Sequence, residues 1–234
     1  MKIYLILRNV TSGDKESPII AGFHASLILT NIQVVEISGT FIKLSMGLKI
    51  GFSINHGYFE NITTFDSLPF IIIEDYLPII QNVTFVNADI GSTLIYFLRN
   101  GGIAIQESSF KNITKRPLNP GGLNDYAKKF ANLEGLCITV IHGYHFSIFS
   151  STFTNIYSTA LYFSVADNID YGIETFQVLD CIFNNTNLQL IPTSQTSTQG
   201  ISWIYSYGVP SLIVENSQFL YNKIAPEYGG VSSG

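Results

Sequence analysis

A short repeated triplet, Phe-x-Asn, constrains the fold of this chain more than any other feature of its sequence. The triplet occurs six times in 234 residues, whereas the numbers of Phe and Asn would give about one copy by chance. Leu versions begin at Leu7 and Leu29, and a version one residue longer ends the series. Most gaps between successive anchors are 22 to 36 residues, a period typical of stacked repeat proteins. With the triplet at Phe130 set aside and the longer version at Phe219 included, the Phe anchors are Phe59, Phe85, Phe110, Phe153, Phe183 and Phe219.

Two short apolar runs, separated by a turn, precede each well-formed anchor. In the copy from Gly91 to Thr114, a run ending at Phe97 leads through the turn Arg99–Gly102 into a second run and then into the anchor. Two strands and two turns per repeat describe one coil of a solenoid, and a coil without a helical segment excludes the helical repeat classes. The pattern therefore predicts an all-β parallel β-helix of about eight coils. An antiparallel sandwich is the alternative, although its hairpin signals are sparse.

A gap of 43 residues between Phe110 and Phe153 predicts one long loop insertion, residues 115–135. The insertion contains several Pro and Gly residues and a helix-like stretch that ends at Phe130. One of the six triplets begins at Phe130, and we expect it to be a decoy because no strand pair precedes it. Residues 189–199, rich in Ser and Thr, predict a second, flexible loop. Residues 1–234 would form one β-helix domain, a fragment of a longer repeat protein.

The composition favours strands and excludes several functional classes. Charged residues make up only 12% of the chain and aromatic residues 13%, which favours pleated strands over helical bundles or disorder. The net charge of −5 comes without a stripe of Lys or Arg, so no nucleic acid is expected as a partner. No apolar run approaches the roughly 20 residues of a membrane-spanning helix, so no membrane-spanning segment is expected.

Alternation of side chains along a strand predicts the role of the repeat. The Phe and the Asn of a triplet are two residues apart and would face the same way, while the mostly polar residue between them would face solvent. We therefore expect the six Phe anchors to form one internal aromatic stack. An inward corner Asn would need partners, which identical amides one coil away can supply. This structural Asn ladder would comprise Asn9, Asn31, Asn61, Asn87, Asn112, Asn155, Asn185 and Asn222. A row of ligand contacts is the alternative role.

The segment Gly101–Ile105 followed by Phe110–Asn112, together with Phe219–Asn222, resembles the repeats of polymorphic outer-membrane proteins. In that family, G-G-A-I and F-x-x-N mark the coils of a right-handed parallel β-helix of the pectin-lyase-like superfamily. Similar Phe and Asn repeats occur in large surface proteins of protists with AT-rich genomes. The resemblance implies a right-handed β-helix and an extracellular or cell-surface location.

Five N-x-Thr sequons stand at Asn9, Asn61, Asn82, Asn112 and Asn184. Three of them are corner residues of the repeat, and an amide buried in a ladder would be unable to carry a glycan. Asn82 and Asn184 have outward parity and are the predicted glycosylation sites if the protein is secreted.

Two cysteines, Cys137 and Cys181, are too few for a disulfide scaffold. Both stand at core-like positions of the repeat, so we expect two buried free thiols. A bridge between them is the alternative.

Many parallel β-helices cleave acidic polysaccharides, and such enzymes need clustered carboxylates on adjacent coils. Asp167 and Asp170 are the nearest approach to such a pair. His56 and His142, each followed by Gly, resemble the His-Gly element of galacturonan hydrolases, whose other elements are missing. His142 and His145 make only a weak metal pattern. We expect no catalytic residue, no metal and no cofactor.

The sequence thus favours a non-enzymatic extracellular structural or adhesive protein, part of a fibre, filament or cell-surface coat. Leu7 arrives before a complete coil, Gly229–Gly234 resembles the start of another, and no charged cap guards either end. Because uncapped coils expose unpaired strand edges, the expected partners are further copies or further coils stacked end to end, with glycans as a second class. The alternative is a carbohydrate-active β-helix, either a polysaccharide lyase or hydrolase or a carbohydrate-binding module, which a convergent acidic cluster would favour.

Overall fold

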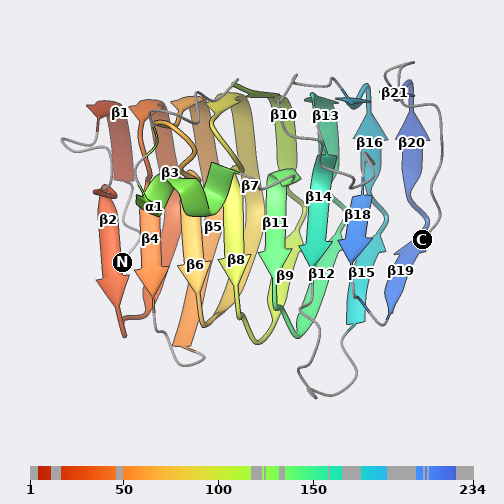
Figure 1. Ribbon diagram of the computed structural model, residues 1–234, viewed down its shortest axis with the longest axis horizontal. Coiled ribbons are helices and arrows are strands. Elements are labelled where there is room, and N and C mark those ends of the chain that lie inside the picture. Colours follow the sequence, from red (N-terminus) through yellow and green to blue (C-terminus); the bar gives the residue numbers. More distant parts are fainter. Residues whose placement is uncertain are drawn as a thin grey trace.

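Parallel β-strands stacked in successive rungs make up most of this computed structural model (Figure 1). The structure describes residues 5–11, 17–45, 50–116, 123, 125–131, 135–157, 159–164, 175–188, 204–207, 209 and 211–224. The strand pairs in these residues are parallel, so the chain winds as a β-solenoid of about six turns. The expected all-β parallel solenoid is confirmed.

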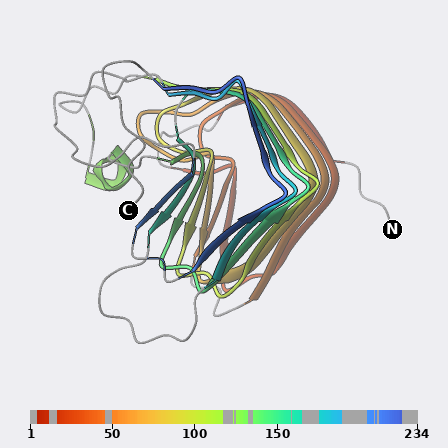
Figure 2. The same cartoon turned by 90° about the vertical axis from the view of Figure 1, so that its right-hand side faces the viewer.

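One sheet of twelve strands forms the long side of the solenoid and is bent into two arms (Figure 2). In the early turns a single long strand crosses both arms, as β5 (Ile50–Thr63) and β7 (Tyr76–Ile90) do. β7 then pairs with β9 (Ile103–Gln106) on the first arm and with β10 (Ser109–Lys115) on the second arm. The other strands of this sheet are β1 (Leu5–Thr11), β3 (Leu27–Ser38), β12 (His145–Phe149), β13 (Thr152–Ile156), β15 (Thr175–Leu179), β16 (Ile182–Asn184), β19 (Leu212–Glu215) and β20 (Gln218–Leu220).

A second sheet of seven strands closes the opposite side of the solenoid (Figure 2). Its strands are β2 (Ile20–Phe23), β4 (Ile42–Ser45), β6 (Ile71–Glu74), β8 (Ile95–Leu98), β11 (Gly135–Ile141), β14 (Thr159–Ser164) and β18 (Ile204–Tyr207). A small third sheet pairs β17 (Asn187–Leu188) with β21 (Lys223–Ile224). Inward apolar side chains from the two large sheets form one continuous core.

The expected number of about eight coils is corrected to about six turns. Seven rungs of the second sheet enclose six turns from the first rung to the last. The eight anchors predict too many coils because one coil is assigned to each anchor. A turn is complete only when the chain has crossed both sheets.

Residues with positive φ mark two corners in the path of the long sheet. The column at the bend between the arms has φ values from 49° to 57° and consists of Asn31, His56, Asn82, Glu107, Ser150, Asp180 and Asn216. The second column, near the far end of the second arm, has φ values from 52° to 56° and consists of Asn9, Glu36, Asn61, Asn87, Asn112, Asn155, Asn185 and Tyr221. Asn is frequent here because its short polar side chain tolerates the left-handed conformation.

The six Phe anchors form a stack inside the second arm. Consecutive ring centroids are 4.8 to 5.3 Å apart and the interplanar angles are 3° to 12°. This distance is close to the spacing of about 4.8 Å between paired strands, because in-register pairing places each ring directly over the previous one. Five of the rings are fully buried, whereas Phe219 on the last rung is 41% exposed.

The anchor expected at Leu29 is wrong. Leu29 lies on the first arm, where it pairs with Ile54, and Val34 occupies the anchor position because it pairs with Phe59. Leu7 pairs with Val34 and is therefore a true member of the column. Five residues separate the two candidates, and both stand in apolar stretches of the same long strand, so sequence spacing alone did not distinguish them.

The insertion places the helix α1 (Asp125–Ala131) against the outer face of the second sheet (Figure 2). Phe130 packs edge-on against Tyr96 with the ring centroids 5.3 Å apart, and the hydroxyl of Ser67 donates a hydrogen bond to the Ala127 carbonyl. Phe130 therefore packs between α1 and the second sheet and is not part of the aromatic stack, as expected for a triplet that is not an anchor. In the part of the chain that the structure describes, no helix is long and apolar enough to span a bilayer.

Candidate functional site: the asparagine ladder and the Arg99 corner

A chain of side-chain hydrogen bonds runs along one corner of the solenoid, from Asn61 through four further rungs. Each amide Nδ2 donates to the Oδ1 of the Asn one rung before it, and the distances are 3.3, 2.9, 2.7 and 2.7 Å in order along the chain. The members of this Asn ladder are Asn61, Asn87, Asn112, Asn155 and Asn185. The ladder thus joins consecutive turns whose lengths range from 25 to 43 residues.

The Asn ladder faces outward, so the expected inward direction is wrong. Asn61 and Asn87 are exposed and the other three are half-buried. The physical reason is the left-handed conformation at each Asn, which interrupts the strand alternation so that two neighbouring side chains face solvent. In the coil around Phe59, the following Glu60 and Asn61 both lie at the surface and Ile62 returns to the core.

Three residues expected in the ladder do not join this chain of bonds. Asn31 belongs to the bend column beside His56, and Glu36 occupies the ladder position of that turn. Asn9 stands at the same column position one rung earlier, where its neighbour is this Glu36.

Asn222 sits one residue beyond the left-handed corner of its turn, which Tyr221 occupies. Its amide folds back instead, donating to the Phe183 carbonyl at 2.9 Å and accepting from the Thr186 backbone N–H at 2.7 Å. The extra residue in Phe219–Asn222 thus moves the amide from the ladder to the backbone of the preceding rung.

A shallow groove of about 400 Å³ lies along the first part of the Asn ladder. Its lining residues are Asn61, Ile62, Thr63, Asn87, Ala88, Asp89, Asn112 and Thr114. Three amides therefore alternate with two hydroxyls and one carboxylate, an arrangement of donors and acceptors suited to a hydroxyl-rich ligand. The groove was not predicted from the sequence. The pattern that could have indicated it is the polar residue, Thr or Asp, that recurs two positions after the Asn of successive anchors.

Asp89 is the charged residue of the groove lining. Arg116 lies beside it, with Nε 3.2 Å from Oδ2. Partial burial raises the pKa of the Asp89 carboxyl above its ordinary value, and the nearby Arg116 and the hydroxyl of Thr114 oppose this shift. The groove is thus close to electrically neutral, because a cation balances its carboxylate.

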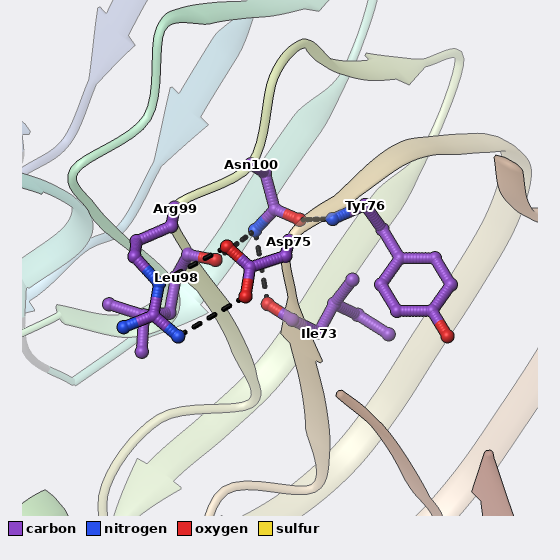
Figure 3. Close-up of polar contacts among 6 residues, drawn as sticks. All are labelled: Ile73, Asp75, Tyr76, Leu98, Arg99 and Asn100. Carbon is purple, nitrogen blue, oxygen red and sulfur yellow. Dashed lines mark hydrogen bonds and ion pairs between the residues drawn. The ribbon is translucent and has the colours of Figure 1, made fainter. Parts of the chain in front are cut away.

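A second polar site, the Arg99 corner, lies at the end of the second sheet (Figure 3). Arg99 donates to both oxygens of Asp75, at 3.1 and 3.2 Å. Beside them the buried amide of Asn100 accepts from the Tyr76 backbone N–H at 2.8 Å and donates to the Ile73 carbonyl at 3.0 Å. The buried amide fixes the turn that carries the exposed ion pair on the outside of the solenoid.

His142 follows Asp75 and Arg99 in the same left-handed column at the Arg99 corner. Partial burial and the positive charge of Arg99 lower the pKa of His142. His145 is exposed on the adjacent strand β12. Among the described residues, no three His, Cys, Asp or Glu side chains gather in a group that could hold a metal ion. Asp167 and Asp170 lie outside the described residues.

The parity used for the sequons does not hold, because the left-handed residues break the alternation. Asn9 and Asn61 are exposed, while Asn82, Asn112 and Asn184 are half-buried. Burial therefore does not exclude Asn61 as a glycosylation site. The side-chain direction that separated the predicted sites Asn82 and Asn184 from the corner residues is not a valid criterion.

Both cysteines are buried and free. Burial raises the pKa of the Cys137 thiol well above its ordinary value and that of Cys181 to about 11. Both thiols are therefore in the poorly nucleophilic protonated form near neutral pH.

A scan against protein-family models, a search of curated proteins and a search of solved structures each return no match for this chain.

Proposed function

We propose that this chain is a non-enzymatic structural or adhesive element of a fibre, filament or cell-surface coat, in an extracellular or cell-surface location. The observation that supports this most is the open face of the last described rung. Phe219 is 41% exposed although Phe183 beneath it is fully buried, and Val214 is 42% exposed above the buried Val178.

The side chains of this rung have the same apolar chemistry as those of the covered rungs. Fully burying a side chain such as Val, Leu or Phe is worth about 1.5–3 kcal/mol, so covering the part that remains exposed adds on the order of 1 kcal/mol for each. A further rung would also pair β19 and β20, which end the strand order of this sheet among the described residues. The proposed partners are accordingly further coils of the same chain or further copies stacked end to end.

The stacking is tested by electron microscopy and sedimentation velocity on the purified chain and on two lysine variants. Val214→Lys places a charge on the open face, whereas Ile213→Lys places the same charge on the neighbouring outward position of β19. We expect particles longer than one chain for the wild type and for Ile213→Lys, and shorter ones for Val214→Lys. Equal lengths for all three would contradict end-to-end stacking.

The location is tested separately, with an antibody against the chain applied to intact and to permeabilised cells of the source organism. Surface labelling of intact cells is expected. Labelling only after permeabilisation would contradict an extracellular or surface role, even if the purified chain forms filaments.

A carbohydrate-active β-helix is the second candidate, and the groove along the Asn ladder is the observation that favours it. Polygalacturonate and a neutral oligosaccharide serve as probes in calorimetric titration and in an assay for new reducing ends. Binding that Asp89→Asn or Thr114→Val abolishes would support a binding module, and new reducing ends would support an enzyme. Absence of both would leave the structural proposal.

A further inference from the structure

The outer face of the first arm carries a neutral surface that is bordered by carboxylates, with Glu107 and Asp180 at the bend and Glu215 on the last rung, β19. From β3 to β15 its outward side chains include no Asp, Glu, Lys or Arg, although the chain has 29 such residues. The outward residues of this neutral face are Ile28, Thr30, Gly51, Ser53, Asn55, Leu77, Ile79, Gln81, Ala104, Gln106, His145, Ser147, Phe149, Thr175, Gln177 and Leu179.

Large apolar side chains project from this neutral face. Ile28 is 69% exposed, Ile79 45% and Leu77 39%. Ile28, Ser53, Ile79 and Ala104 pair in succession, so they form one row that crosses four rungs. The outer face of the second sheet is different, because α1 covers part of it. The second arm is different too, because its outward row includes Arg8, Glu60 and Lys111.

We propose that two copies of this chain associate side by side through the neutral face, each copy using the same surface. Two molecules of net charge −5 repel one another, and on the neutral face they can meet without dehydrating a charged side chain at the centre of the contact, because the neighbouring carboxylates lie at its border. Parallel sheets are generally covered on both faces, and two such sheets pack face to face at about 10 Å. The same patch on both copies gives a closed two-fold dimer.

The size of the neutral face sets the strength of the dimer. Six rungs at about 4.8 Å and five residues at about 3.3 Å give a footprint of roughly 475 Å² per copy. The total of about 950 Å² lies below the roughly 1,200 Å² at which stable specific interfaces begin, so the dimer is weak and reversible. Lateral pairing uses a different surface from the open rung, and it holds whether or not end-to-end stacking occurs.

The experiment is sedimentation equilibrium over a concentration series, in the Val214→Lys background so that end-to-end stacking does not contribute. Ile79→Lys adds a charge at the centre of the neutral face. Val86→Lys is the matched control, because it adds the same charge at an outward position of the same strand, β7, on the second arm. We expect dimers for the parent and the control, and at least a tenfold weaker association for Ile79→Lys.

Either of two results would overturn the proposal: a monomer at every concentration, or equal weakening by the two lysine variants. If the parent is a monomer, added cellohexaose that perturbs the nuclear magnetic resonance signals of the neutral face would show that this face binds a glycan instead. Circular dichroism of each variant shows whether it is folded, and Ser53→Lys on the same face replaces Ile79→Lys if that variant is not.

Discussion

At the scale of single residues, the corner asparagines do two jobs that separate variants can distinguish. Each adopts a left-handed backbone conformation and also links two turns through its side-chain amide. A row of outward amides is a weaker device than a buried one, since solvent competes for each hydrogen bond. The ladder fixes the register between turns, because a shift by one position would place the core residue Ile62 at the corner in place of Asn61.

Replacing Asn112 separates these two effects. Asn112→Gly keeps the left-handed backbone and removes the bonds to Asn87 and Asn155, so the free energy of unfolding should fall by about 1 kcal/mol. Asn112→Ala also strains the backbone and should lose about 1–2 kcal/mol more. Asn61→Gly, which loses a single bond, is the control with a smaller effect. Urea unfolding measures all three, and a Gly variant as stable as the wild type would show that the ladder contributes nothing.

His142 makes stability depend on pH. Its pKa lies below the ordinary value of 6.5 in the folded chain, so the folded state binds the proton less readily than the unfolded state. The stability contributed by His142 is therefore present above pH 6.5 and is lost as the pH falls through the folded pKa. Between pH 7 and pH 5 the urea midpoint should fall less for His142→Gln than for the wild type. An identical pH dependence in both proteins would contradict this role.

The sequence predicted the residues of the ladder better than their direction. Asn61, Asn87, Asn112, Asn155 and Asn185 were identifiable because each follows a Phe anchor at a fixed spacing. Their outward direction was not, because alternation assumes an extended backbone at every residue and the sign of φ is set by the turn. The Arg99 corner was missed for another reason. Its residues are unlike one another, so no repetition marks them as neighbours.

At the scale of elements, α1 acts as a cover for part of the second sheet. Tyr96 lies beneath it, and burial there raises the pKa of its hydroxyl to about 12. The length of the insertion was visible in the spacing of the anchors. Its docking position was not, because the contacts of Phe130 with Tyr96 and of Ser67 with Ala127 join segments far apart in the sequence.

Phe130→Ala should loosen this cover without unfolding the solenoid, because Phe130 lies in a cluster separate from the main core. Water would reach Tyr96, and its pKa should fall from about 12 towards the ordinary value of 10.0. Carbon-13 labelling of the tyrosine rings measures this titration residue by residue. Lys128→Ala, on the exposed side of α1, is the control and should leave the pKa of Tyr96 unchanged.

At the scale of the whole molecule, the same substitution should have effects that depend on its rung. Phe110→Ala opens a cavity between two stacked rings and should cost about 3–5 kcal/mol of unfolding free energy. Phe219→Ala removes a ring that is already 41% exposed and should cost less than half of that value. Chemical denaturation of both variants at low protein concentration tests the comparison. Equal losses would show that Phe219 is covered in solution.

In the solenoid, the distance between two stacked residues depends on the number of rungs between them and not on the number of residues in the chain between them. The rings of Phe110 and Phe153 are 4.9 Å apart although 43 positions separate them, and those of Phe85 and Phe110 are 5.3 Å apart across 25 positions. The extra chain leaves at a corner and returns to the same register. A foreign peptide added within residues 115–135 should therefore leave the pitch of the stack unaltered. This makes the insertion a natural place to graft an epitope or a second protein onto the solenoid.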